Sequence, residues 1–155
     1  MSVSKAIFAT LVMSQASLCR HAEPETIEIP PVPPVSNSAI PWESFSGERV
    51  AQTTGRPLFI NFRAEWSIGC KVNEVKVLSS PEFQSSLAKN AVIPLWADLT
   101  QGDPEIAAWL EKYQRTGVPT YIVVPADRSK PALVLPEYPS LRDLTDALDQ
   151  VGSTK

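Results

Sequence analysis

The reactive chemistry that this sequence offers is limited by its two cysteines and one histidine. Cys19 and Cys70 are the only cysteines, and His21 is the only histidine. Two thiols form neither a four-cysteine zinc site nor a disulfide framework. Because His21 lies in the N-terminal segment, a histidine-dependent triad or a histidine-rich metal site is excluded from the folded part. Thiol chemistry in the folded part therefore rests on Cys70 alone.

The run W-S-I-G-C-K at residues 66–71 surrounds this cysteine. Serine is a good helix N-cap, so Ser67 predicts a helix start that places Cys70 one turn in. A serine hydroxyl ionises far above neutral pH, and the folded part has no histidine to serve as its base. Ser67 also cannot form a disulfide. Cys70 is then either a small buried residue or a lone reactive thiol.

The elements around this run alternate between helix and strand. We expect helices at residues 42–54, 67–79, 81–88, 104–113 and 141–151, and strands at 58–62, 91–98, 121–124 and 132–135. The residues at 58–62 are mostly apolar, as in a buried central strand. Pro94 predicts an irregularity within its strand. The order predicts an α/β fold, with a central mixed sheet of about four strands and helices on both faces.

Composition and charge exclude one class of function. The net charge is −3, from 14 Lys plus Arg against 17 Asp plus Glu, over 155 residues. No run of basic residues occurs, and aromatic residues are not interleaved with basic ones, so nucleic-acid binding is not expected. A hydrophobic content of 43% suits one packed domain.

The chain divides into three segments. Residues 1–16 predict a signal peptide: Lys5, a short apolar run at 6–13, and small residues at Ser14 and Ala16. That run is too short to span a bilayer. Residues 17–41 form a Pro-rich linker of extended conformation, and residues 42–152 form the folded domain. The protein is expected to be periplasmic or otherwise exported, with tethering by an uncleaved N-terminus as the alternative.

Four short sequence motifs along the domain resemble those of a known family. They are C-K-V-N-E at 70–74, A-D-L-T at 97–100, G-V-P at 117–119 and L-P-E at 135–137. In this order they resemble the thioredoxin superfamily, and within it the C-terminal thioredoxin-like domains of the DsbD group of thiol:disulfide interchange proteins. The resemblance covers about residues 41–152.

The resemblance assigns a place to each candidate residue. Ser67 stands where the attacking cysteine of a C-x-x-C pair would be, and Cys70 stands at the resolving position. Asn61 takes the place of a buried acid, but an amide cannot carry a proton as that acid does. Glu74 matches a carboxylate near the site, and Trp66 matches a tryptophan that shields the pair. Losing nucleophile and proton acceptor together suggests a coordinated loss of dithiol chemistry.

The remaining candidates concern substrate binding. Lys71 completes the pattern after the cysteine, and Gly117 leads into the loop. Pro119 matches a cis-proline, and Val118 matches the residue whose backbone pairs with an extended peptide. The resemblance implies no metal and no organic cofactor. It implies a protein or peptide partner, of which a membrane thiol electron-transfer protein is one candidate.

Three functions follow from these observations. The first is an exported, DsbD-like protein of thiol-disulfide homeostasis that lacks dithiol reductase turnover and binds peptides or proteins through the loop at 117–119. The second is a monothiol oxidoreductase that uses Cys70. The third is a regulatory competitor of an intact DsbD-type reductase. Whether the protein is an enzyme is left open between them.

Overall fold

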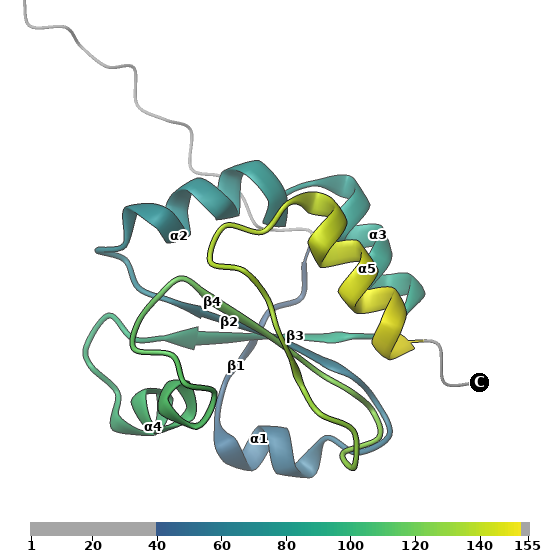
Figure 1. Ribbon diagram of the computed structural model, residues 1–155, viewed down its shortest axis with the longest axis horizontal. Coiled ribbons are helices and arrows are strands. Elements are labelled where there is room, and N and C mark those ends of the chain that lie inside the picture. The colour runs from purple at the N-terminus through teal and green to yellow at the C-terminus, as the bar shows by residue number, and fades with distance from the viewer. Residues whose placement is uncertain (1–39, 153–155) are drawn as a thin grey trace, which may run out of the picture. The chain divides into compact units, whose positions relative to one another are not determined.

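The computed structural model describes residues 40–152 as one layered α/β arrangement (Figure 1). The predicted signal peptide, with Cys19 behind it, and all but the end of the predicted linker lie outside the described residues. The elements in chain order are β1 (Glu43–Ser44), α1 (Gly47–Gln52), β2 (Leu58–Arg63), α2 (Ile68–Asn73), the π-helix η1 (Glu74–Leu78), α3 (Pro81–Lys89), β3 (Ile93–Asp98), α4 (Pro104–Lys112), β4 (Thr120–Val124), β5 (Leu133–Val134) and α5 (Leu141–Gly152).

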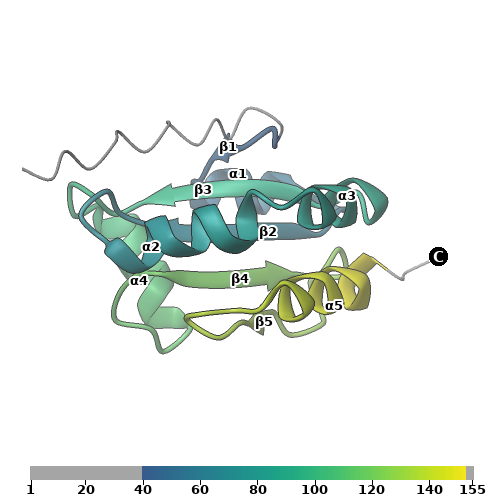
Figure 2. The same cartoon turned by 90° about the horizontal axis from the view of Figure 1, so that it is seen from above.

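The sheet is mixed, and its strand order is β1-β3-β2-β4-β5. β3 runs parallel to both β1 and β2, whereas β4 runs antiparallel to β2 and to β5. Helices α2, α3 and α5 cover one face, and α1 and α4 cover the other (Figures 1 and 2). The predicted α/β class is confirmed, with five strands among the described residues where about four were expected.

The additional strand corrects the prediction of a helix over residues 42–54. Glu43 and Ser44 pair with Leu95 and Trp96 as the two-residue strand β1. The helix begins only at Gly47, where the Ser46 Oγ accepts the backbone N–H of residue 49. Tertiary pairing at the sheet edge therefore overrides the helical pattern until the serine cap.

The irregularity predicted at Pro94 is also wrong. The register of β2 with β3 runs without interruption from Leu58↔Ile93 to Arg63↔Asp98, and Pro94 pairs with Phe59. On its other side β3 pairs with β1 only at residues 95 and 96. Among the described residues, Pro94 thus has a paired strand on one side only, so its missing backbone N–H interrupts no second ladder.

Alternation along β2 sends its side chains to two different cores. Phe59 faces α2, η1, α3 and α5, where it packs with Phe83 and Tyr121. Leu58, Ile60 and Phe62 point to the opposite face, under α1 and α4. All six residues of β2 are buried, as expected for the central strand of this sheet.

Candidate functional site

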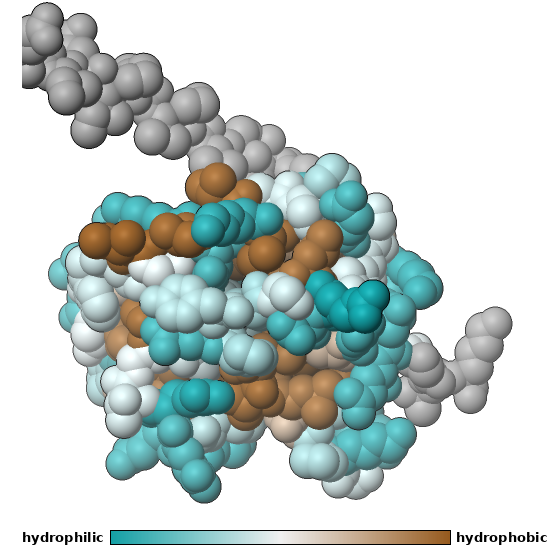
Figure 3. Space-filling model, turned by 45° about the horizontal axis from the view of Figure 1, so that its top comes forward, coloured by the Kyte–Doolittle hydropathy of each residue, from teal (hydrophilic) through white to brown (hydrophobic). Residues whose placement is uncertain are grey.

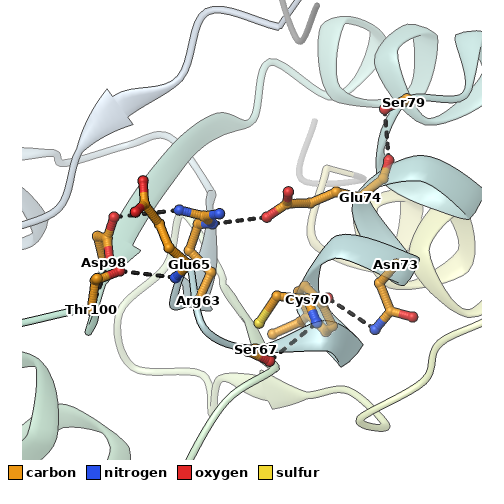
Figure 4. Close-up of polar contacts among 10 residues, drawn as sticks. Arg63, Glu65, Ser67, Cys70, Asn73, Glu74, Ser79, Asp98 and Thr100 are labelled. Atoms are coloured by element: carbon orange, nitrogen blue, oxygen red, sulfur yellow. Dashed lines mark hydrogen bonds and ion pairs between the residues drawn. The ribbon is translucent and has the colours of Figure 1, made fainter. Parts of the chain in front are cut away.

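The carboxyl end of β2 turns directly into the N-terminus of α2, and Ser67 caps that helix. Its backbone is extended (φ −84°, ψ 109°), and its Oγ accepts the backbone N–H of Cys70 at 3.2 Å. The Ser67 N–H itself donates to the Ala64 carbonyl at 3.1 Å. Only 7% of Ser67 is exposed, so its hydroxyl serves the helix end (Figure 4). The predicted cap is confirmed.

Cys70 lies one turn into α2, on the side of the helix that faces the sheet. Its thiol is free, and the residue is only 1% exposed. A thiolate must reach its target to react, so this burial limits attack by Cys70 on any partner in the described conformation. Since its neighbour at the helix cap is an oxygen, the two side chains cannot close a disulfide.

A hydrogen-bonded pair lies next to Cys70 on the inner side of α2. The Asn73 amide donates to the Tyr121 hydroxyl at 3.0 Å and to the Glu137 carbonyl at 2.8 Å. Burial raises the pKa of Tyr121 well above its ordinary range, although the Asn73 hydrogen bond opposes this. Tyr121 therefore stays protonated and links β4 to the helix.

Asn61 stands in contrast to Asn73, because its polar atoms have no partner. The residue is fully buried in β2, and neither its Nδ2 nor its Oδ1 makes a hydrogen bond. Its register neighbours are Trp96 on β3 and Tyr121 on β4. Paired residues share a face of a sheet, so Asn61 points into the same core as Tyr121, toward the layer that holds α2.

Glu74 begins η1 and pairs with Arg63 at the end of β2. The Arg63 Nε lies 2.8 Å from the Glu74 Oε1, and its Nη1 lies 3.4 Å from the Asp98 Oδ2 (Figure 4). The guanidinium also stacks over the Trp96 ring at 4.6 Å. Burial would raise the pKa of Asp98, but hydrogen bonds from Thr100 and the charge of Arg63 hold that pKa below its ordinary value.

The loop at 117–119 meets α2 at Gly69. The Val118–Pro119 peptide bond is cis, and Pro119 is buried. A Cβ added at Gly69 would lie 3.2 Å from the Pro119 Cδ and 3.1 Å from the Tyr138 hydroxyl. Three segments distant in sequence thus converge on one helix end. Beside them is an open hollow of about 210 Å³, lined by residues 115–120 and 137.

Two predicted site residues lie on the outside of this arrangement. Trp66 is 63% exposed in the turn before the cap, and Lys71 is exposed on α2. The structure therefore brings Ser67, Cys70, Gly117, Val118 and Pro119 to one end of the molecule. Asn61 is fully buried on the sheet face that carries Tyr121, and Glu74 is paired with Arg63.

Comparison with known proteins identifies the family. A family model described as thioredoxin-like matches residues 43–126, which is more than half of the 155-residue chain. The chain belongs to the thioredoxin-like family. The resemblance stated from the sequence is thereby confirmed at the level of the family.

Relatives of this thioredoxin-like chain include thiol:disulfide interchange proteins named DsbD. The protein from Klebsiella pneumoniae is 34% identical over 80 residues, which are 52% of this chain and 13% of that relative. The protein from Yersinia pestis is 33% identical over 73 residues, which are 47% of this chain and 12% of that relative. The chain thus matches only a small part of these much longer relatives.

Solved structures agree with the thioredoxin-like fold. The reduced DsbD C-terminal domain of Neisseria meningitidis superposes with a TM-score of 0.53 and 23% identity, covering 67% of this chain and 88% of that one. A thioredoxin from Thermus thermophilus gives 0.58 and 20%, covering 74% and 88%. At these identities the likeness concerns the fold.

Sequence reasoning missed three residues of this thioredoxin-like site. Arg63 falls just beyond the strand predicted at 58–62, Asn73 was noted only within the predicted helix and the C-K-V-N-E motif, and Tyr138 was not singled out. A charged residue in an otherwise apolar buried strand is the signal that could have found Arg63. Within residues 40–152, no three metal-binding side chains gather into a cluster, and no helix has the length and hydrophobicity to cross a bilayer.

Proposed function

We propose that this protein is a peptide- or protein-binding module of the thiol-disulfide type that lacks dithiol reductase turnover. One observation carries the proposal: the position facing Cys70 at the helix cap is a serine, and its oxygen is committed to the backbone N–H of Cys70. The named relatives are thiol:disulfide interchange proteins. The fold of such a protein is present here without a second sulfur at the motif.

The chemistry explains why turnover should be absent. A dithiol reductase needs one thiolate to attack and a second thiol to release the mixed disulfide. Ser67 supplies neither, because an alcohol forms no S–S bond and is not deprotonated near neutral pH. The burial of Cys70 counts against the monothiol alternative, since a partner's disulfide must reach the sulfur for exchange.

Peptide binding does not require a second thiol, and the loop at residues 117–119 offers a surface for it. Val118 precedes the buried Pro119 and is itself half-buried beside the open hollow. An extended segment laid along this loop can form backbone hydrogen bonds with Val118, as in strand addition. Exposed aromatic side chains of Trp66 and Tyr138 offer apolar contact nearby.

The proposed setting follows from the N-terminal segment and the relatives. We place the protein outside the cytoplasm, in the periplasm or tethered to a membrane, because residues 1–16 have the pattern of a signal peptide. The proposed partner is a protein or peptide, with a membrane thiol electron-transfer protein as one candidate. Occupying that partner's docking surface would make this chain a competitor of an intact reductase.

The binding surface is tested with reduced, carboxymethylated α-lactalbumin as an unfolded probe that carries no free thiol. We expect fluorescence anisotropy to show saturable binding to the wild-type protein. Val118→Pro removes one backbone donor and should weaken binding about fivefold. Cys70→Ala should bind as the wild type does. Loss of binding in Cys70→Ala with no effect of Val118→Pro would overturn the proposal.

The loss of turnover is tested by insulin reduction. The wild-type protein is expected to give no rate above that of dithiothreitol alone, whereas Ser67→Cys restores a dithiol and should raise the rate. Ser67→Ala serves as the matched control, because it removes the hydroxyl without adding sulfur. Catalysed reduction by the wild-type protein at the rate of Ser67→Cys would contradict the proposal.

A further inference from the structure

The outer surface of α2 and η1 carries a row of apolar side chains that the core does not use. Ile68 is 78% exposed, Val75 is 53% exposed, and Val72 is also exposed between them. Their spacing of four and three residues places them along one side of a helix. Apolar patches are visible over this region of the surface (Figure 3). We call these three residues the outer stripe.

The opposite side of the same helix is already occupied. Its buried residues are Cys70, Asn73 and Leu78, which face the sheet and α5. The ion pair between Glu74 and Arg63 ties the start of η1 to the end of β2 at 2.8 Å. This tie fixes the rotation of the helix about its axis, so the outer stripe is held toward solvent.

Two lysines are chain neighbours of the outer stripe. Lys71 precedes Val72 on α2, and Lys76 follows Val75 on η1. Both lysines are exposed. Among the ion pairs within residues 40–152, none involves either of them. Each lysine therefore adds an exposed positive charge next to an apolar residue of the stripe.

This surface is separate from the loop at Val118. Gly69, next to Ile68 in the chain, is the helix residue that contacts Pro119. Successive helix residues point about 100° apart, so the loop and the outer stripe use different sides of α2.

We propose that the outer stripe docks an amphipathic helix of a partner protein, one whose apolar row is bordered by Asp or Glu. Three branched side chains in a row over about 10 Å match the spacing of anchors on a second helix. The two lysines then face the acidic borders, which sets the choice and orientation of the partner. This inference goes beyond the proposed function, because it adds a second docking surface.

The probe is a synthetic helical peptide of about 20 residues with a Leu row and Glu on both borders, alongside the same peptide with Lys borders. Calorimetric titration of the wild-type protein should show binding of the Glu-bordered peptide at least tenfold tighter than of the Lys-bordered one. The double variant Lys71→Glu with Lys76→Glu should invert that preference. Lys130→Glu is the matched control on an exposed lysine elsewhere, and it should leave the preference intact.

The apolar contribution is tested with Val72→Ser and Val75→Ser together, which should weaken the Glu-bordered peptide about tenfold or more. Val134→Ser, on an exposed valine of β5, should not weaken it. Val118→Pro should also leave it unchanged, which separates this surface from the loop. Equal affinity for both peptides, or unchanged binding by the double serine variant, would overturn the proposal. So would binding to vesicles of anionic phosphatidylglycerol with no binding of either peptide.

Discussion

The two faces of the central sheet differ in what they bury. Beneath α1 and α4, the side chains of β2 are Leu58, Ile60 and Phe62, and the one buried polar strand residue, Thr120, donates its hydroxyl to a loop carbonyl at 2.8 Å. The face beneath α2, η1, α3 and α5 also has a large apolar core, yet it includes Asn61 and Arg63 on the same strand.

This difference separates a nearly apolar layer from a layer whose stability also depends on buried polar side chains. An apolar face depends on volume and shape, so it persists when the reactive residues change. The face beneath α2, η1, α3 and α5, called the motif-side face below, depends in addition on whether each buried polar group has a hydrogen-bond partner. An unpaired buried polar group costs free energy, whereas a paired one does not. Ser67 and Asn61 lie on that second side.

The largest expected loss of stability comes from a substitution in the apolar face beneath α1 and α4. Phe62 is fully buried, and its ring packs against Phe45 with centroids 5.6 Å apart. Phe62→Ala should lower the free energy of unfolding by about 3–5 kcal/mol, through lost burial and the cavity left behind. Urea unfolding measures the loss. Phe45→Ala is the matched control on a half-buried ring and should cost less; an equal or larger cost there would contradict this ranking.

A smaller change in stability is expected when two asparagines on the motif-side face are replaced and compared. Asn73→Leu removes the donor to Tyr121 and to the Glu137 carbonyl, and should destabilise the protein by about 1–3 kcal/mol. Asn61→Leu replaces a side chain with no partner by an apolar one of similar size. It should be neutral or stabilising by up to about 1 kcal/mol. Unfolding of both variants under the same conditions decides the matter, and a loss at Asn61 equal to that at Asn73 would refute the comparison.

The smallest effect concerns pH and Asp98. Its pKa is lower in the folded protein than its ordinary value, so the ionised form contributes stability above about pH 4, and this is lost as the pH falls through the lower, folded pKa. Because 40% of the side chain is exposed, water screens the contribution to less than about 1 kcal/mol. Asp98→Asn should be less stable than the wild type at pH 7, and the gap should close in acid. A gap that is constant between pH 7 and pH 3 would disprove the assignment.

Local patterns were enough to predict much of the architecture. The serine cap, the buried run that became β2, and the Asp103-Pro104 start of α4 are decided by residues close together in the chain. The two misplaced features, the start of the first helix and Pro94, lie at the sheet edge. There, pairing with a strand far away in sequence decides the backbone, and no local signal reports it.

The sequence by itself determined that one thiol stands in the folded part and that the residue three positions before it is a serine and not a second cysteine, because these follow from residue identity alone. Tertiary structure decided that this thiol is buried, that Glu74 is engaged by Arg63, and that Tyr138 and Pro119 meet at Gly69. Each of these depends on contacts between elements distant in the chain. Burial and pairing are properties of the packed layers, so they arise only when the helices close over the sheet.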